Sequence, residues 1–559
     1  MFTFIHTYAE NVFPALIKSG LWREGDGLKL MHKPGSVPPY DFNTLVKKDS
    51  PLYKLLKELR CTFYIDRLQG GVGYDKTYLY SEKELSELKE LLGDKFLGFQ
   101  FHEWASNFRS DMKRICELSE KEGFNLENEE DRKNFWHKII AKEMYLFLEA
   151  FSAEHWAKKT LSENLDEFLE DCEKFYSLRT KETEGLLFPT DSYFMAPKTE
   201  ISNGAKLLLP EVGWQIPNMR IQIAFTRGMA KSAGIPWGIY YECWQHTEGI
   251  GFSIPFSLRE GQDEWLEDLL HQGAGNDLPF EQREYGGSSL SLLSRAWRYA
   301  YFSGAAFIGE EYGVCNTFRN LKTAELSPYG NEKYAFLRFT EEFTDIGEPF
   351  VSFAIILPKN MKMLDISLGE KYLEYPLTDE YMPIEESLYR KIKSSLEEIF
   401  GYTGKYGNMG HVLKCGGLPG VFDIVYEDCE EALAKYSYLI DFTENTEFAQ
   451  KHQNTVTTNE AKALIDSLLP LKVNSNLFTS YNRTASGWYV LIMNNDGIQH
   501  DVFSPDIKTE ESIVNTEITL AAPNTALKKC AGNGELHHIG SKYSLNLLAG
   551  EWILLFVNK

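Results

Sequence analysis

Short apolar runs alternate with helical stretches over roughly the first three-fifths of the chain. Each run is rich in β-branched or aromatic residues and is apolar on both faces, which is typical of a strand buried in a parallel sheet. These runs occupy residues 2–8, 28–33, 61–67, 96–104, 186–192, 206–213, 237–244 and 305–311. The helical stretches that accompany them are residues 11–20, 81–92, 111–176, 218–233, 289–302 and 331–343. This alternation predicts an α/β fold, a (β/α)8 TIM barrel that spans residues 1–346.

The pattern changes twice after the predicted barrel. Strand-like runs at residues 351–358, 421–428 and 435–442, with a helical stretch at 387–399, predict a small flavodoxin-like α/β domain over residues 347–468. From residue 469 the chain is all-β, with apolar strands at 487–503, 517–522 and 544–557. An Asn-Asn-Asp-Gly sequence at residues 494–497 predicts a hairpin-type turn. Residues 469–559 are therefore expected to form a C-terminal β-sandwich.

Charge excludes several classes of partner. The 559 residues include 58 Lys and Arg against 81 Asp and Glu, a formal net charge of −23. Nucleic acids and anionic membranes are bound through basic residues that neutralise phosphates, so this chain is expected to bind neither. No apolar run approaches the roughly 18 residues that span a bilayer.

Cysteine usage bears on the cellular compartment. The 8 cysteines are scattered, without CxxC pairs or zinc-like spacing. Several lie inside apolar runs, as buried thiols do, which favours a reducing compartment. The first residues also lack the basic start, apolar core and cleavage site of a secretory signal. We expect a cytoplasmic location.

Carboxylates stand at the ends of several predicted strands. In a (β/α)8 barrel the active site lies at the carboxyl ends of the strands. Burying charges there costs several kcal/mol each unless they face a wet cleft, so a row of them predicts an active site. The strand-end carboxylates are Asp66, Glu103, Asp191, Glu211, Glu242, Glu310 and Glu311.

Glu103 and Glu242 are the preferred catalytic pair. Glu103 ends the fourth predicted strand and Glu242 ends the seventh. Paired carboxylates across a cleft suit glycoside hydrolysis, in which one protonates the leaving oxygen and the other attacks or activates water. Strands four and seven face each other obliquely across a barrel mouth, where a separation of about 5 Å gives retention of configuration. The sequence therefore predicts a retaining glycoside hydrolase that needs no metal or cofactor.

Two alternatives remain open at this level. Glu211, paired with Glu310 or Glu311 on strands six and eight, would serve an inverting glycosidase or a lyase. A barrel that binds carbohydrate without catalysis would also retain these side chains. Residues that flank the strand ends are candidates for substrate contacts, although each of them could instead pack at the barrel rim. They are His6, His32, Asp66, Arg67, His102, Trp104, Asp191, Tyr241 and Trp244.

The placement of Glu103 and Glu242 resembles that of the clan A glycoside hydrolases, whose acid/base follows strand four and whose nucleophile follows strand seven. The order of barrel, small α/β domain and β-sandwich resembles the β-galactosidases of family 42 and their relatives, over the whole chain. That group usually has Asn before the acid/base, whereas His102 stands there in this sequence. The resemblance implies an oligosaccharide or glycoside substrate and a homo-oligomer formed through the middle domain.

Overall fold

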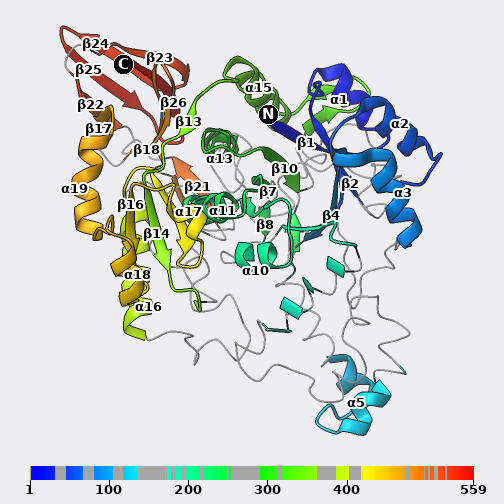
Figure 1. Ribbon diagram of the computed structural model, residues 1–559. Helices are drawn as coiled ribbons and strands as arrows, with labels where there is room; N and C mark the ends of the chain where they lie inside the picture. Colours follow the sequence, from blue (N-terminus) through cyan, green and yellow to red (C-terminus); the bar gives the residue numbers. More distant parts are fainter. Residues whose placement is uncertain are drawn as a thin grey trace.

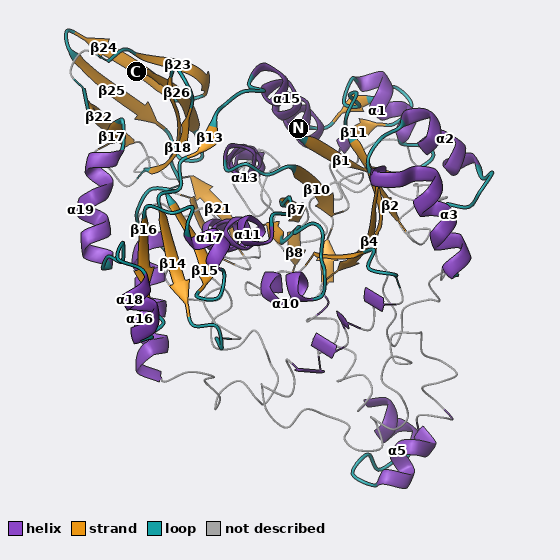
Figure 2. Ribbon diagram, in the orientation of Figure 1, coloured by secondary structure: helices purple, strands orange, loops and turns teal. Residues whose placement is uncertain are grey.

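The structure of the protein is a computed structural model, which describes most of the chain (Figure 1). The described residues are 2–31, 46–66, 81–102, 104, 117–135, 138, 170–190 without 172, 175, 178, 179 and 182, 196–213, 219–242, 245–247, 251–253, 290–311, 317–361, 386–401, 417–473, 477–495, 498–501, 504–508, 514–522 and 525–559. They form a curled parallel sheet with helices, a smaller parallel sheet with helices, and antiparallel sheets near the C-terminus (Figure 2).

All eight apolar runs predicted as strands lie in one parallel sheet. Its strands are β1 (Thr3–Tyr8), β2 (Gly27–Met31), β3 (Phe63–Asp66), β4 (Phe96–His102), β5 (Leu187–Thr190), β6 (Glu211–Gly213), β7 (Gly238–Glu242) and β10 (Phe307–Glu311). Their order is β5-β4-β3-β2-β1-β10-β7-β6, so the last strand pairs with the first. This is the circular order of a (β/α)8 barrel, and within the described residues no ladder joins β5 to β6. The strand prediction is confirmed.

Helices connect these strands largely where the sequence predicts them. They are α1 (Phe13–Ser19), α2 (Pro51–Leu59), α3 (Glu82–Leu92), which the 3-10 turn η1 (Gly93–Lys95) follows, α5 (Glu129–Phe135), α10 (Ala196–Ser202), α11 (Met219–Ala233), α13 (Leu290–Phe302) and α15 (Pro328–Glu342). Ser81 and Glu84 form the reciprocal capping box that begins α3. Gly20 ends α1 with a φ of 76°, a left-handed conformation that glycine adopts without a Cβ penalty. Most of the helix predicted over residues 111–176 lies outside the described residues.

The two faces of the curled sheet bury different side chains. Along each strand, alternate residues point to opposite faces. Ile5, Phe188 and Leu209 belong to a small apolar cluster inside the curl. Phe4, one residue from Ile5, packs instead on Trp297 of α13, with ring centroids 5.3 Å apart. This alternation decides which strand-end residues reach the interior and which reach the helices.

The small α/β domain packs directly against a helix of the first domain. Its parallel strands are β14 (Phe353–Leu357), β15 (Phe422–Tyr426) and β16 (Tyr438–Asp441), in the order β15-β14-β16. Its helices are α16 (Glu386–Phe400), α17 (Glu430–Leu433), α18 (Thr446–Lys451) and α19 (Thr458–Leu468). A Cβ at Gly228 in α11 would lie 2.4 Å from the carbonyl oxygen of Ile424, so this glycine lets α11 approach β15 closely.

The C-terminal part is antiparallel, as the sequence predicts. One sheet has the order β13-β18-β19-β26-β23 and the other β17-β22-β25-β24. A Cβ at Gly534 would meet Leu547 of one sheet and Ile553 of the other, so the two sheets are packed together there. The strands are β13 (Glu348–Pro349), β17 (Leu471–Val473), β18 (Phe478–Arg483), β19 (Gly487–Met493), β22 (Val514–Leu520), β23 (Leu527–Gly532), β24 (Glu535–Ile539), β25 (Lys542–Leu547) and β26 (Trp552–Asn558).

Three short hairpin ladders complete the described structure. They are β8 (Gln245–Thr247) with β9 (Gly251–Ser253), β11 (Phe318–Asn320) with β12 (Glu325–Leu326), and β20 (Ile498–Asp501) with β21 (Ser504–Lys508). Thus β20 pairs with β21, whereas β19 pairs with β18 and β26. The turn predicted at residues 494–497 therefore does not join two strands that pair with each other.

Candidate active site

Polar side chains lie side by side on the interior face of β6 and β7, next to a glycine on β10. Glu211, Tyr240 and Gly309 are direct neighbours in register, and neighbouring residues in register share a face. The side chain of Tyr240 accepts a hydrogen bond from Lys29 of β2, three strands away in the sheet order. Such a contact runs through the inside of the curl, so this face is the interior one. Glu211 is 1% exposed there.

One layer closer to the carboxyl ends, the interior face carries more glutamate positions. Glu242 on β7 lies opposite Glu311 on β10 and opposite Gly213 on β6. Glu311 is buried, at 3% exposed. The backbone position of Glu242 is described, and its side chain lies outside what the structure describes. Glutamate positions therefore lie on the interior face of three adjacent strands, with Glu242 and Glu311 in the layer at the carboxyl ends, where barrel enzymes hold their active sites, and Glu211 in the layer below.

Lys29 is the basic residue of this interior. Its ammonium donates to the Tyr240 hydroxyl at 2.5 Å and to the Glu310 carbonyl oxygen at 3.2 Å. It also lies 4.7 Å from the centroid of the Tyr240 ring. The side chain is 1% exposed. Lys29 is thus a buried lysine held between β7 and β10 by a hydroxyl and a backbone carbonyl.

Tyr64 lies beside this group. It is opposite Lys29 in register, and its ring packs edge-on against Phe188 at 5.1 Å. A Cβ at Gly309 would lie 3.2 Å from the Tyr64 hydroxyl and 3.7 Å from the ring of Tyr240. The missing side chain at Gly309 therefore makes room for both tyrosines. We call Lys29, Tyr64, Glu211 and Tyr240 the interior polar cluster.

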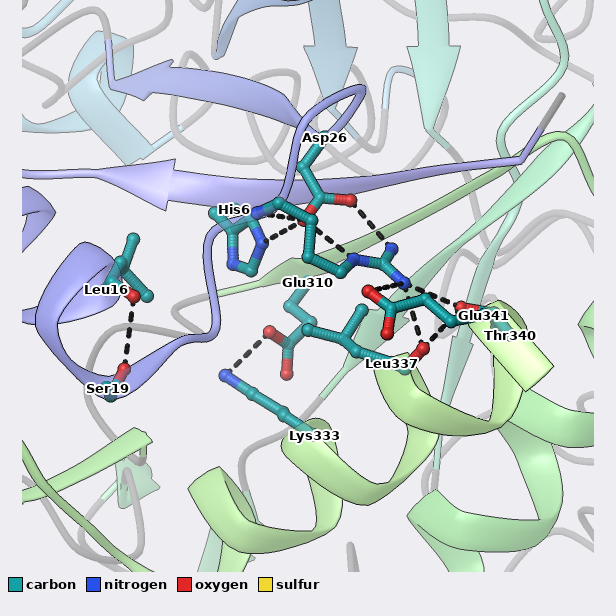
Figure 3. A network of polar contacts seen from close by, with 10 residues as sticks. His6, Leu16, Ser19, Asp26, Glu310, Lys333, Leu337, Thr340 and Glu341 are labelled. Atoms are coloured by element: carbon teal, nitrogen blue, oxygen red, sulfur yellow. Dashed lines mark hydrogen bonds and ion pairs between the residues drawn. The ribbon is translucent and has the colours of Figure 1, made fainter.

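Two predicted site residues lie on the opposite face, toward the helices (Figure 3). The Glu310 carboxylate pairs with Lys333 of α15 at 2.7 Å, and both side chains are 3% exposed. His6 is a buried neighbour of Asp26, at 3.3 Å, and Asp26 in turn binds Arg23 at 2.8 Å. Burial raises the pKa of Asp26, but His6 and Arg23 outweigh it and hold that pKa below its usual value. These contacts join β1 and β10 to the surrounding helical layer.

Tyr241 and Trp104 are also packed away from the interior. Tyr241 is fully buried with its ring 5.9 Å from Trp297 of α13. Trp104 is 1% exposed, lies 5.4 Å from the ring of Tyr176, and donates its indole N–H to Glu200 at 3.3 Å. Burial, followed by the charge of Glu200, raises the pKa of Tyr176 well above its usual value. Their contacts are those of rim and helix packing.

The remaining predicted residues lie wholly or partly beyond the described part of the chain. Those outside it are His32, Arg67, Glu103, Asp191 and Trp244. Asp66 and His102 are the last residues of β3 and β4, and their side chains are not described. Since β4 ends at His102, Glu103 is the next residue of the chain after the strand.

Sequence reasoning missed Lys29, Tyr64 and Tyr240. Lys29 stands between Leu28 and Leu30 in a run that we interpret as apolar on both faces, and a lone polar residue in a strand normally marks a solvent-facing side. Inside a barrel both faces are buried, so the polar residue in such a run marks the interior instead. Tyr64 and Tyr240 each stand two residues before a strand-end carboxylate, at Asp66 and Glu242, and this spacing was the available signal.

The described residues contain no group of three or more His, Cys, Asp or Glu side chains that could hold a metal ion. Within the same residues, no helix is both long and apolar enough to cross a bilayer.

No protein-family model matches the chain, and no curated protein matches its sequence. Among solved structures, the chain is similar to α-L-fucosidase isoenzyme 2 from Paenibacillus thiaminolyticus, with a TM-score of 0.45, 10% identity, and coverage of 100% of this chain and 99% of that one. It is similar to the family 98 glycoside hydrolase module from Streptococcus pneumoniae, with a TM-score of 0.44, 9% identity, and coverage of 99% and 98%. The β-galactosidase from Halorubrum lacusprofundi gives a TM-score of 0.40, 8% identity, and coverage of 100% and 99%. Likeness at this level identifies neither a family nor a reaction.

Proposed function

We propose that the protein is a glycoside hydrolase whose active site lies at the carboxyl ends of the parallel strands. The observation that carries the proposal is the meeting of Glu211, Glu242 and Glu311 positions on the interior face of three adjacent strands. Grouped carboxylates suit the hydrolysis of a glycosidic bond, which needs one proton donor and one nucleophile or base. The substrate would be a glycoside or oligosaccharide.

We assign Glu103 as acid/base and Glu242 as nucleophile in a retaining mechanism. In the first step Glu103 protonates the leaving oxygen while the Glu242 carboxylate attacks the anomeric carbon and forms a glycosyl ester. In the second step Glu103 removes a proton from water, which attacks the same carbon and releases Glu242. The strand order supports this assignment, because β4 and β7 are the fourth and seventh strands of the sheet.

A general acid must hold its proton at neutral pH, and a nucleophile must stay ionised. The apolar run that precedes Glu103 is suited to raise the pKa of an acid. Tyr241 precedes Glu242 in the chain, but its ring packs against Trp297 on the helix side, so we do not assign it as a donor to Glu242. We therefore assign the interior donors to Lys29 and Tyr240, which lie on the face where the Glu242 position is found.

The test is a panel of aryl glycosides offered to the wild type and to single glutamine variants. Glu103→Gln and Glu242→Gln are expected to lower kcat/KM by about 10²–10⁴-fold on the sugar that the wild type accepts. The matched control is Glu310→Gln, because this neighbour of Glu311 pairs with Lys333 on the outer face. It should lower the melting temperature, because Lys333 loses its buried carboxylate partner, and it should retain kcat/KM within a few-fold at a temperature where the variant is folded.

Three results would contradict the assignment. Wild-type turnover of no glycoside, with binding retained, would indicate a carbohydrate-binding barrel. Full activity in Glu103→Gln and Glu242→Gln, with loss in Glu211→Gln and Glu311→Gln, would move the chemistry to the second pair and make inversion the expected outcome. Equal losses in Glu310→Gln would show that the substitutions act through folding.

A further inference from the structure

We infer that Lys29 is a positioning residue of the proposed active site, which keeps the interior glutamates ionised and fixes the Tyr240 hydroxyl as a donor. This inference rests on the proposed function and extends it to a residue that takes no part in the covalent steps. Lys29 is buried inside the curled sheet, opposite Tyr64 on the neighbouring strand and below the layer that holds Glu242 and Glu311.

The contacts of Lys29 orient Tyr240. An ammonium has three donors and no acceptor, so the oxygen of Tyr240 accepts in their 2.5 Å contact. The phenol proton must then point away from Lys29. The neighbours of Tyr240 in register on the same face are Glu211 and Gly309, with Glu242 two residues further along its own strand. The second donation, to the Glu310 carbonyl, ties the ammonium to β10.

Charge explains why a lysine is tolerated there. Burying an ammonium away from water is strongly unfavourable unless anionic groups compensate its charge. The titratable positions on the interior face around Lys29 are Tyr64 and Asp66 on β3, His102 on β4, Glu211 on β6, Tyr240 and Glu242 on β7, and Glu311 on β10. Lys29 is the basic side chain described among them, and the carboxylates outnumber it.

The consequence for catalysis follows from this balance. Carboxylates grouped on adjacent strands raise one another's pKa, whereas a cation within about 4–6 Å lowers it. A nucleophile must be ionised before it attacks, so removing the cation would shift the ionisation of the nucleophile to higher pH. Tyr240, held by Lys29, supplies a donor that does not need to reorganise during the reaction.

The experiment measures kcat/KM against pH for the wild type, Lys29→Met, Lys29→Gln and Lys29→Arg on the aryl glycoside that the wild type accepts. In Lys29→Met the acidic limb of this pH profile, the rise of kcat/KM as the nucleophile ionises, is expected to move to higher pH by about one unit. Lys29→Gln keeps a donor for Tyr240 without the charge, so its limb should move as well. Lys29→Arg keeps the charge and should restore the limb toward its wild-type position.

The control is Lys333→Met, which removes a buried ammonium whose carboxylate partner, Glu310, lies on the outer face. It should lower the melting temperature and leave the acidic limb in place. A limb in Lys29→Met and Lys29→Gln that stays where the wild type has it would overturn the inference, as would an equal shift in Lys333→Met.

A second readout does not depend on activity. Without Lys29, the pKa of the interior glutamates in the folded protein should rise, so ionising them as the pH increases should destabilise the fold. The destabilisation of Lys29→Met and Lys29→Gln should therefore grow from pH 5.5 to pH 8. Each unit by which the glutamate pKa rises should change the unfolding equilibrium constant by about tenfold. Destabilisation that is constant with pH would overturn the inference. Growth with pH in a protein that hydrolyses no glycoside would support the coupling and refute the proposed function, so the two failures are distinguishable.

Discussion

A buried ionic network joins the curled sheet's outer helix to the small α/β domain. Asp423 of β15 is fully buried and accepts from Arg227 of α11 at 2.7 Å and from Lys231 at 2.7 Å. The Tyr436 hydroxyl donates to the same carboxylate at 2.7 Å. Burial raises the pKa of Asp423, but the charges of Arg227 and Lys231 hold it below its usual value. Asp423 therefore compensates the charges of two cations, Arg227 and Lys231.

Replacing Asp423 with alanine should be strongly destabilising. Arg227 is 6% exposed, so it would keep a buried and uncompensated charge, while the Lys231 side chain is 27% exposed and can turn toward water. Breaking a buried pair from one side costs about 3–5 kcal/mol. Replacing both partners, in Asp423→Leu with Arg227→Met, should recover more than half of that loss, because no buried charge is then left alone.

The assay is urea unfolding followed by circular dichroism, with hydrogen exchange of α11 and β15 to locate the loss. The control is Glu517→Gln, which breaks an exposed pair with Lys542 at 3.2 Å and should change stability by no more than about 0.5 kcal/mol. A loss in Asp423→Ala no larger than that of the control would refute the reasoning. So would a double variant as unstable as Asp423→Ala.

Three further predictions concern pH, metals and assembly. Asp26→Asn should lower the melting temperature at pH 7, and the difference from the wild type should shrink as pH falls below about 4, because the lowered pKa of Asp26 stabilises the fold only while the group is ionised; a difference that is constant with pH would contradict this. Glycosidase activity should survive EDTA, since paired carboxylates need no metal; a loss that one divalent ion restores would overturn the two-glutamate mechanism. Light scattering at micromolar concentration should give a multiple of 64.2 kDa, as the resemblance implies; a monomer mass would refute that proposal.

The strands were predictable because a buried parallel strand must be apolar on both faces. That requirement gave eight runs, and all of them are strands of the same sheet. For the same reason the sequence pattern does not show which face of the sheet an individual side chain occupies. Glu310 and Glu311 are adjacent at the end of one predicted strand, and the sequence does not tell which of them faces the interior. Burial does not distinguish them either, because both are buried in the structure. The ion pair between Glu310 and Lys333, some twenty residues apart, decides it.

The sequence indicated at which end of the sheet the candidate site lies, but it did not indicate which side chains face the interior. Strand-end glutamates were identified by position, and the structure brings the Glu211, Glu242 and Glu311 positions together on one face. His6 and Tyr241 had the same signal, but the two-residue alternation of their strands turns them toward the helices. The turn predicted at residues 494–497 shows a related limit, because turn residues indicate where a chain reverses and do not determine which strands pair.

The central claim is that Glu242 becomes covalently glycosylated during turnover. The most direct measurement is mass spectrometry of peptides after treatment with a 2-deoxy-2-fluoro glycosyl fluoride of the sugar that the wild type accepts. The fluorine at C2 slows both the formation and the hydrolysis of the glycosyl ester, whereas the fluoride leaving group at C1 speeds formation alone, so the ester accumulates. The account predicts time-dependent loss of activity and one added glycosyl group on the peptide that carries Glu242, absent in Glu242→Gln. An adduct on Glu211 or Glu311, or a product of inverted configuration with no adduct at all, would contradict it.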